Sequence, residues 1–179
     1  MRSVVVRSLC LTLVGALVAL AAPASRAEPI RSPGRFGLGL GSSTLANGLS
    51  AKYFMSRGDA LQFALGEFGG GGLRHRWDRF DDGLALGVDY LVEMPDITRA
   101  GRAFDLAWNV GGGIGLGFDD DNADRHDDFA FAIAFVLGLE FDFIPIPLDI
   151  VLEWRPGILL VPDTDFDAVD FTAHIRVYF

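Results

Sequence analysis

Apolar and polar side chains alternate along most of the chain from residue 35 to the carboxy terminus. A period of two sends successive side chains to opposite faces of a β-strand. The connections between the alternating segments are by turns short turns and longer polar loops. Two connections depart from this order: 94–102 is long where a short turn is expected, and 42–47 is short where a long loop is expected. The alternation predicts eight strands, at residues 35–41, 48–56, 60–68, 83–93, 104–118, 129–142, 148–159 and 168–179.

The two faces of these strands differ in the size of their side chains. In 129–142 one face carries large apolar groups, whereas the other carries alanine, glycine and valine with Glu140 and Asp142. A soluble barrel buries its large apolar groups, but a membrane barrel turns them outward and fills a narrow lumen with small and ionic groups. Because open edges leave backbone groups unsatisfied in lipid, the sheet must close. We therefore expect an all-β fold, an eight-stranded antiparallel up-and-down transmembrane β-barrel, with Phe129, Phe131, Phe135 and Phe179 facing lipid.

Residues 129–148 could instead form a transmembrane helix, because they are strongly apolar. The uninterrupted apolar run is only eleven residues long, however, and ends at Glu140. A helix needs about 20 apolar residues to cross a bilayer. Pro145 and Pro147 also oppose a helix here. We therefore favour a strand.

The composition agrees with a strand-rich fold in a single domain. The 179 residues include 22 glycines, which disfavour helices, and 15 phenylalanines, which favour pleated surfaces. The formal net charge of −9 argues against a nucleic-acid partner, because phosphate binding needs a basic surface.

The first 27 residues have the pattern of a secretory signal peptide. Arg2 and Arg7 precede an apolar stretch at 9–22, and Ser25-Arg26-Ala27 supplies a small-x-small cleavage site. The alternative is an uncleaved anchor, which the short apolar stretch disfavours. We expect the mature barrel domain to span 28–179. Cleavage would remove Cys10, the one cysteine, and would exclude disulfides and thiol chemistry.

Projecting the alternation onto a barrel places a set of ionisable residues in the lumen. Buried charges are costly unless they are paired, so a narrow interior should join them in networks. We favour a structural plug of salt bridges over the alternatives, a gated ion path or a small-solute site, because eight-stranded barrels leave no continuous channel. The set is Lys52, Asp89, Glu93, Asp105, Glu140, Glu153, Arg155, His174 and Arg176.

Two loops contain clustered charges. Residues 119–128 are rich in carboxylates, which suit calcium, but they lack the residue order of an EF-hand, and we interpret them as a solvated acidic loop. Arg74, Arg76 and Arg79 form a basic cluster that could contact lipid phosphates, including those of lipopolysaccharide; the alternative is a simple soluble loop. We predict no metal site and no cofactor.

Catalytic chemistry has little support in the sequence. Beyond the signal peptide the histidines are His75, His126 and His174, and His174 has no serine in its own predicted strand. Hydrolases of the outer membrane need a nucleophile oriented by a base. Spatial proximity between strands leaves this alternative open, but we predict that the protein is not an enzyme.

The last strand resembles the terminal signal by which bacterial outer-membrane barrels are recognised by the barrel-assembly machinery. Val177 and Phe179 match that pattern, whereas His174 stands where glycine is usual. In the order and spacing of several segments, the chain resembles a family of small, largely uncharacterised outer-membrane barrels of the OmpA/OmpX-like class. The segments are 36–41, 48–54, 89–91, 111–115 and 147–153 with Pro156. The resemblance implies an eight-stranded barrel in the outer membrane of a Gram-negative bacterium, with no catalytic residues to carry over.

The favoured function is therefore that of a small outer-membrane barrel with a structural, membrane-integrity or surface-interaction role, in contact with outer-membrane lipid. One alternative is a soluble periplasmic barrel that binds an apolar ligand inside, as lipocalins do. A less favoured one is an outer-membrane lipid hydrolase.

Overall fold

The computed structural model describes residues 35–68, 83–100, 103–119 and 129–179. Within these ranges one sheet contains eleven strands. They are β1 (Phe36–Ser42), β2 (Ala46–Phe54), β3 (Asp59–Phe68), β4 (Gly83–Glu93), β5 (Thr98–Ala100), β6 (Phe104–Asp119), β7 (Phe129–Phe143), β8 (Leu148–Trp154), β9 (Gly157–Val161), β10 (Asp165–Asp167) and β11 (Phe171–Tyr178).

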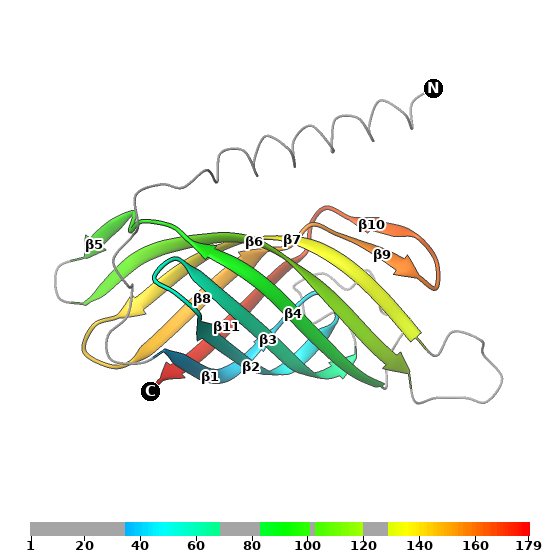
Figure 1. Cartoon of the computed structure of the whole chain (residues 1–179), viewed down its shortest axis with the longest axis horizontal. Helices are drawn as coiled ribbons and strands as arrows, with labels where there is room; N and C mark the ends of the chain where they lie inside the picture. Colours follow the sequence, from blue (N-terminus) through cyan, green and yellow to red (C-terminus); the bar gives the residue numbers. More distant parts are fainter. Residues whose placement is uncertain (1–34, 69–82, 101–102, 120–128) are drawn as a thin grey trace, which may run out of the picture.

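The sheet closes on itself through antiparallel pairing of the first and last strands, β1 and β11 (Figure 1). The ring runs β1, β2, β3, β4, β6, β7, β8 and β11, and every neighbouring pair in it is antiparallel. This closed, eight-stranded antiparallel barrel confirms the predicted fold class. Among the described strands, β5 pairs only with β6, and β10 pairs only with β9.

The predicted strand 148–159 is interrupted at Arg155 and Pro156, which separate β8 from β9. Both pieces follow β7 in one register, because Leu137 pairs with Trp154 and Ala134 pairs with Gly157. Proline has no N–H to give to a neighbouring strand, so the interruption falls where Pro156 stands. β9 then turns back into β10, within a segment that the sequence pattern assigned to a loop.

Residues 129–148 form β7 and the turn into β8, so the helical alternative for this segment is wrong. No helix in the described ranges is long and apolar enough to cross a membrane. The long connection 94–102 contains β5, which forms a hairpin with the start of β6. The unusual length of that connection therefore reflects an extension of the sheet.

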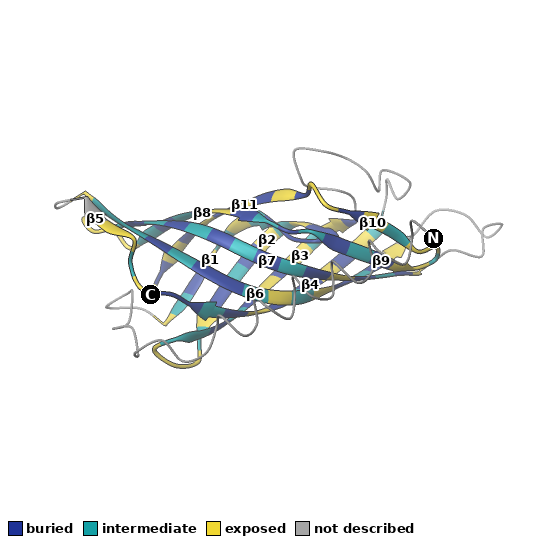
Figure 2. Cartoon of the chain, turned by 90° about the horizontal axis from the view of Figure 1, so that it is seen from above, coloured by how far each residue is buried: buried dark blue, intermediate teal, exposed yellow. Residues whose placement is uncertain are grey.

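Burial alternates along the ring strands, as the bands in Figure 2 show. In β11 every second residue is buried, beginning with Thr172. Phe129 and Phe179 are exposed on the outer face, and Phe131 and Phe135 are partly exposed. The large apolar side chains therefore point outward, and small or polar ones point inward.

The short connection between β1 and β2 folds into the barrel end. Ser43, Thr44 and Leu45 are all almost fully buried. Leu45 packs in an apolar cluster with Phe68 at the end where the loops 69–82 and 120–128 begin. A Cβ on Gly115 would lie 2.9 Å from the Leu45 side chain, and one on Gly117 would lie 2.4 Å from the Phe68 ring. The glycines of β6 therefore make room for this apolar cluster.

Candidate functional site

Within the described residues, the buried ionisable side chains gather in the polar interior of the barrel. Of the nine ionisable residues projected into the lumen, Asp105 is partly exposed near the start of β6. The other eight are buried: Lys52, Asp89, Glu93, Glu140, Glu153, Arg155, His174 and Arg176.

One group of contacts centres on Arg155, which the break between β8 and β9 places inside the barrel. Its guanidinium pairs with Asp89 at 2.5 Å and with Glu153 at 2.6 Å. It also donates to Thr44 Oγ1 at 3.2 Å, so the inward-folded connection is tied to the segment that follows β8. The Arg155 guanidinium thus donates to two carboxylates and one hydroxyl. Arginine suits such a buried position because its planar group carries several N–H donors.

Gln62 links this group to the rest of the interior. Its Nε2 donates to Asp89 at 3.1 Å and to Glu153 at 2.9 Å, and its Oε1 accepts from Arg176 at 2.6 Å. The sequence analysis projected only ionisable residues and so missed it. The signal was present, because Gln62 pairs across the sheet with Lys52 and Asp89 on the same face.

A second group lies nearer the short turns. Lys52 pairs with Glu140, and with Glu93 at 2.6 Å. Asn109 donates to the same Glu140 oxygen at 2.5 Å. These residues come from β2, β4, β6 and β7, so their contacts cross the lumen rather than following one strand.

Arg176 completes this group by binding Asp149, a carboxylate that the sequence analysis did not select. The guanidinium lies 3.0 Å from Asp149 Oδ2, and Tyr178 donates to the same oxygen at 2.9 Å. Asp149 faces Arg176 directly across the β8–β11 pair. Its inward position follows from the alternation, two residues before Val151 and four before Glu153.

The interior carries more negative than positive charge. Eight carboxylates are buried among the described residues, six of them on ring strands, whereas the fixed buried cations number three. The six on the ring strands are Asp89, Glu93, Glu140, Asp142, Asp149 and Glu153, the other two are Asp167 and Asp170, and the cations are Lys52, Arg155 and Arg176.

His174 also joins a serine to a carboxylate. The Ser50 hydroxyl lies 2.8 Å from Nδ1, and Nε2 lies 3.0 Å from Glu153 Oε2. Ser50 belongs to β2, so only the closed barrel brings it to His174. The order resembles a serine hydrolase triad. Ser50 is, however, 0% exposed, and a Cβ on Gly41 would lie 2.2 Å from the His174 ring, so the arrangement lacks the substrate access that such a triad needs.

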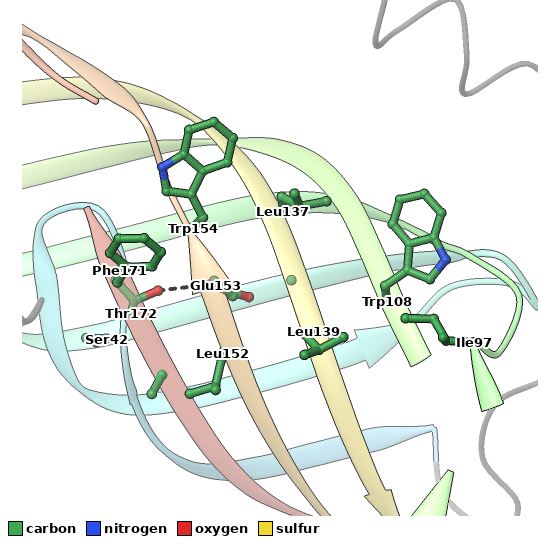
Figure 3. A pocket seen from close by; sticks show the side chains of 12 residues that line it. Ser42, Ile97, Trp108, Leu137, Leu139, Leu152, Glu153, Trp154, Phe171 and Thr172 are labelled. Atoms are coloured by element: carbon green, nitrogen blue, oxygen red, sulfur yellow. Dashed lines mark hydrogen bonds between the residues drawn. The ribbon is translucent and has the colours of Figure 1, made fainter. Parts of the chain in front are cut away.

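An apolar groove lies on the outer surface, across β6, β7, β8 and β11 (Figure 3). It has a volume of about 700 Å³ and lies between Trp108 and Trp154, with Leu137, Leu139 and Leu152 along its floor. Figure 3 also shows Thr172 bonded to Glu153, at 3.2 Å. The outer side of the barrel wall is therefore apolar at the groove, whereas the inner side of the same strands carries ionic groups.

Several residues singled out from the sequence lie outside the described ranges. They include the signal-peptide segment 1–27, Arg74, Arg76, Arg79, His75, His126 and most of the acidic loop. The residues of the predicted assembly signal are described: Val177 and Phe179 are both exposed on the outer face. The Phe179 ring contacts Phe36 on β1, with centroids 5.6 Å apart, so the terminal aromatic lies at the seam of the ring.

Together the fold and the interior define a class of protein: a closed eight-stranded barrel with an ionic, filled interior and an apolar outer surface. No family model, curated protein or solved structure matches the chain.

Proposed function

We propose that the protein is a small outer-membrane β-barrel whose interior is plugged, and that it has a structural, membrane-integrity or surface-interaction role. The observation that carries this proposal is the inverted distribution of side chains. Ionic groups fill the interior, and large apolar groups cover the outside. This distribution is typical of barrels that span a membrane.

The outer surface is apolar over several adjacent strands. Leu40, Leu84, Ile114, Leu152 and Ile175 are each more than 40% exposed, and they come from β1, β4, β6, β8 and β11. A soluble monomer rarely exposes apolar patches larger than a few hundred Å². In lipid the same surface is favourable, so the pattern supports residence in a bilayer.

Aromatic side chains at the two ends of the β6–β7 hairpin support the same proposal. Phe104 lies near Phe143 at one end, with centroids 6.2 Å apart, and Phe118 lies 5.6 Å from Phe129 at the other. The fourteen residue-to-residue steps from Phe104 to Phe118 span about 46 Å of strand, or roughly 33 Å along the axis at a tilt near 45°. That separation suits aromatic girdles on either side of an apolar band about 25 Å tall.

The interior contacts favour a plug over a pore. The chain of bonds from Arg176 through Gln62 and Asp89 to Arg155 joins β11, β3 and β4 with the end of β8. The apolar cluster around Leu45 fills the next section of the interior. Because Lys52, Arg155 and Arg176 are each paired with a carboxylate from another strand, an open path would require several buried ion pairs to separate at once.

The two alternative functions find less support. A lipocalin-like protein needs an apolar interior for its ligand, whereas the groove found here lies on the outer surface. A lipid hydrolase is favoured only by the contacts of Ser50 with His174 and Glu153. A fluorophosphonate probe tests that function: labelling of wild type that disappears in Ser50→Ala would support a hydrolase and count against a purely structural role.

Cell fractionation tests the main proposal. The full-length gene is expressed in a Gram-negative host, and the mature protein is followed through soluble and membrane fractions. We expect it in the outer membrane, extracted only by detergent and migrating faster on gels before heating than after. Recovery of folded protein from the periplasm without detergent would refute the proposal.

A further inference from the structure

Three aspartates stand side by side on the interior face near the short turns. Asp142 on β7 is directly opposite Asp105 on β6 and directly opposite Asp149 on β8. Glu140 lies two residues before Asp142 and therefore faces the same way. Like charges directly opposite each other in a sheet are destabilising, so positive charge beside this row is stabilising, and Arg176 supplies part of it at Asp149.

The arrangement also has the dimensions of a cation site. One oxygen from each of Glu140, Asp142 and Asp149 lies within 4.8 Å of the others, and all three residues are buried. Calcium binds carboxylate oxygens at about 2.3–2.6 Å, so two of its ligands lie up to roughly 5 Å apart. The smaller Mg²⁺ binds at about 2.0–2.1 Å and requires a tighter set.

A second observation points to a missing ligand. Glu140 is 0% exposed, and its Oε1 accepts from Lys52 and Asn109. Its Oε2 is buried and has no hydrogen-bond partner among the described residues, and the same holds for Asp105 Oδ1. Buried carboxylate oxygens without partners are costly, and a bound cation would satisfy them.

The half of the interior near the short turns contains more buried carboxylates than fixed cations among the described residues. Lys52 and Arg176 are the buried fixed cations there, and they lie with four buried carboxylates: Glu93, Glu140, Asp142 and Asp149. A divalent cation at the row of aspartates would offset this difference.

We propose that Glu140, Asp142 and Asp149 bind a divalent cation inside the barrel, with Ca²⁺ the preferred ion and Asp105 an additional ligand. Tyr178 and Arg176 hold Asp149 in position. Because Arg176 already neutralises part of the Asp149 charge, we expect weak binding, with a Kd of about 10⁻⁴–10⁻³ M, as in extracellular calcium modules. The proposal depends on the barrel and its interior, not on the membrane location.

Binding is measured on the mature protein folded in detergent micelles. Terbium, which replaces calcium, should give luminescence sensitised by Tyr178, and excess Ca²⁺ should abolish it. Ca²⁺ at about ten times its Kd should raise the Tm by roughly 3–6 °C relative to EDTA, and Mg²⁺ should raise it less. Equal Tm values with Ca²⁺ and EDTA, or an equal effect of Mg²⁺, would overturn the proposal.

Asp142→Asn is the decisive variant, because it keeps the size of the side chain and removes one ligand charge. It should lose the terbium signal and the Ca²⁺-dependent rise in Tm. Asp163→Asn, in the exposed connection between β9 and β10, is the matched control and should keep both. If Asp142→Asn does not fold, Glu140→Gln serves as the second variant. A calcium response in either interior variant equal to that of Asp163→Asn would also contradict the site.

Discussion

Replacing an outward-facing residue with lysine distinguishes a lipid-facing surface from a water-facing one. Ile114 lies in the middle of β6, is 42% exposed, and pairs with Val88 and Ile133 on the neighbouring strands. Ile146, in the turn between β7 and β8, is 52% exposed and serves as the control. Lysine near the bilayer midplane costs about 2–4 kcal/mol, but only about 0–1 kcal/mol near the interface.

The assay is reversible folding into lipid vesicles, followed by tryptophan fluorescence during urea titration. A loss of about 2–4 kcal/mol corresponds to a roughly 30- to 900-fold change in the folding equilibrium. With an m-value near 2 kcal/mol/M, Ile114→Lys should lower the urea midpoint by about 1–2 M. In water, both lysines would change stability by less than about 0.5 kcal/mol. Equal midpoints for Ile114→Lys and Ile146→Lys would therefore refute the lipid-facing assignment.

Three further substitutions test the interior and its rim, each by urea-induced unfolding. Gln62→Leu removes bonding partners from Asp89, Glu153 and Arg176 and should cost about 2–4 kcal/mol; a neutral effect would show that Gln62 does not hold the network together. Asp170 lies just before β11, and burial raises its pKa to about 6, above the usual value of 3.8. The protonated carboxyl therefore stabilises the folded state fully below pH 4, and this stabilisation is lost as the pH rises through 6. Asp170→Asn should remove this decline of about 3 kcal/mol, and an unchanged pH profile would contradict the buried position. Gly115→Val should overpack against Leu45 by about 1–3 kcal/mol and should be rescued by Leu45→Ala; additive effects in the double variant would contradict the contact.

The strand pattern could be predicted from the sequence because burial in a barrel has a strict period of two. That period also identified which face is ionic, as Lys52, Asp89 and Arg176 illustrate. It does not indicate which residues meet across the lumen. The partners of Gln62, Asn109 and Asp149 lie on neighbouring strands but are far away in the sequence, so the period along one strand does not reveal them.

The inward course of residues 43–45 could not be predicted either. The segment is polar and short, which describes an exposed turn equally well. Its burial depends on the space left by glycines elsewhere: a Cβ on Gly87 would lie 2.0 Å from Ser43 Oγ, and one on Gly115 would meet Leu45. The information is thus divided among three segments of the chain, and no local pattern contains it.

The same complementarity explains how the last strand accommodates His174 on its interior face. On β11 the interior positions are His174, Arg176 and Tyr178, and their direct partners on β1 are Gly41, Gly39 and Gly37. A Cβ on Gly41 would lie 2.2 Å from the His174 ring, and one on Gly37 would lie 2.6 Å from the Tyr178 ring. The small residues that make room for these side chains therefore lie on the neighbouring strand, β1.

This pairing of glycine with a large side chain bears on whether the interior conducts. An open lumen requires small or short side chains on facing strands, so that a column of water fits between them. Here the space beside Gly37 and Gly41 is taken by the β11 side chains of Tyr178 and His174, and Gly113 on β6 gives room to Asp89, which Arg155 then holds. Glycine content alone would suggest a wide interior. Because these glycines accommodate large neighbours that are held by hydrogen bonds and ion pairs, they do not leave a continuous column of water through the described interior.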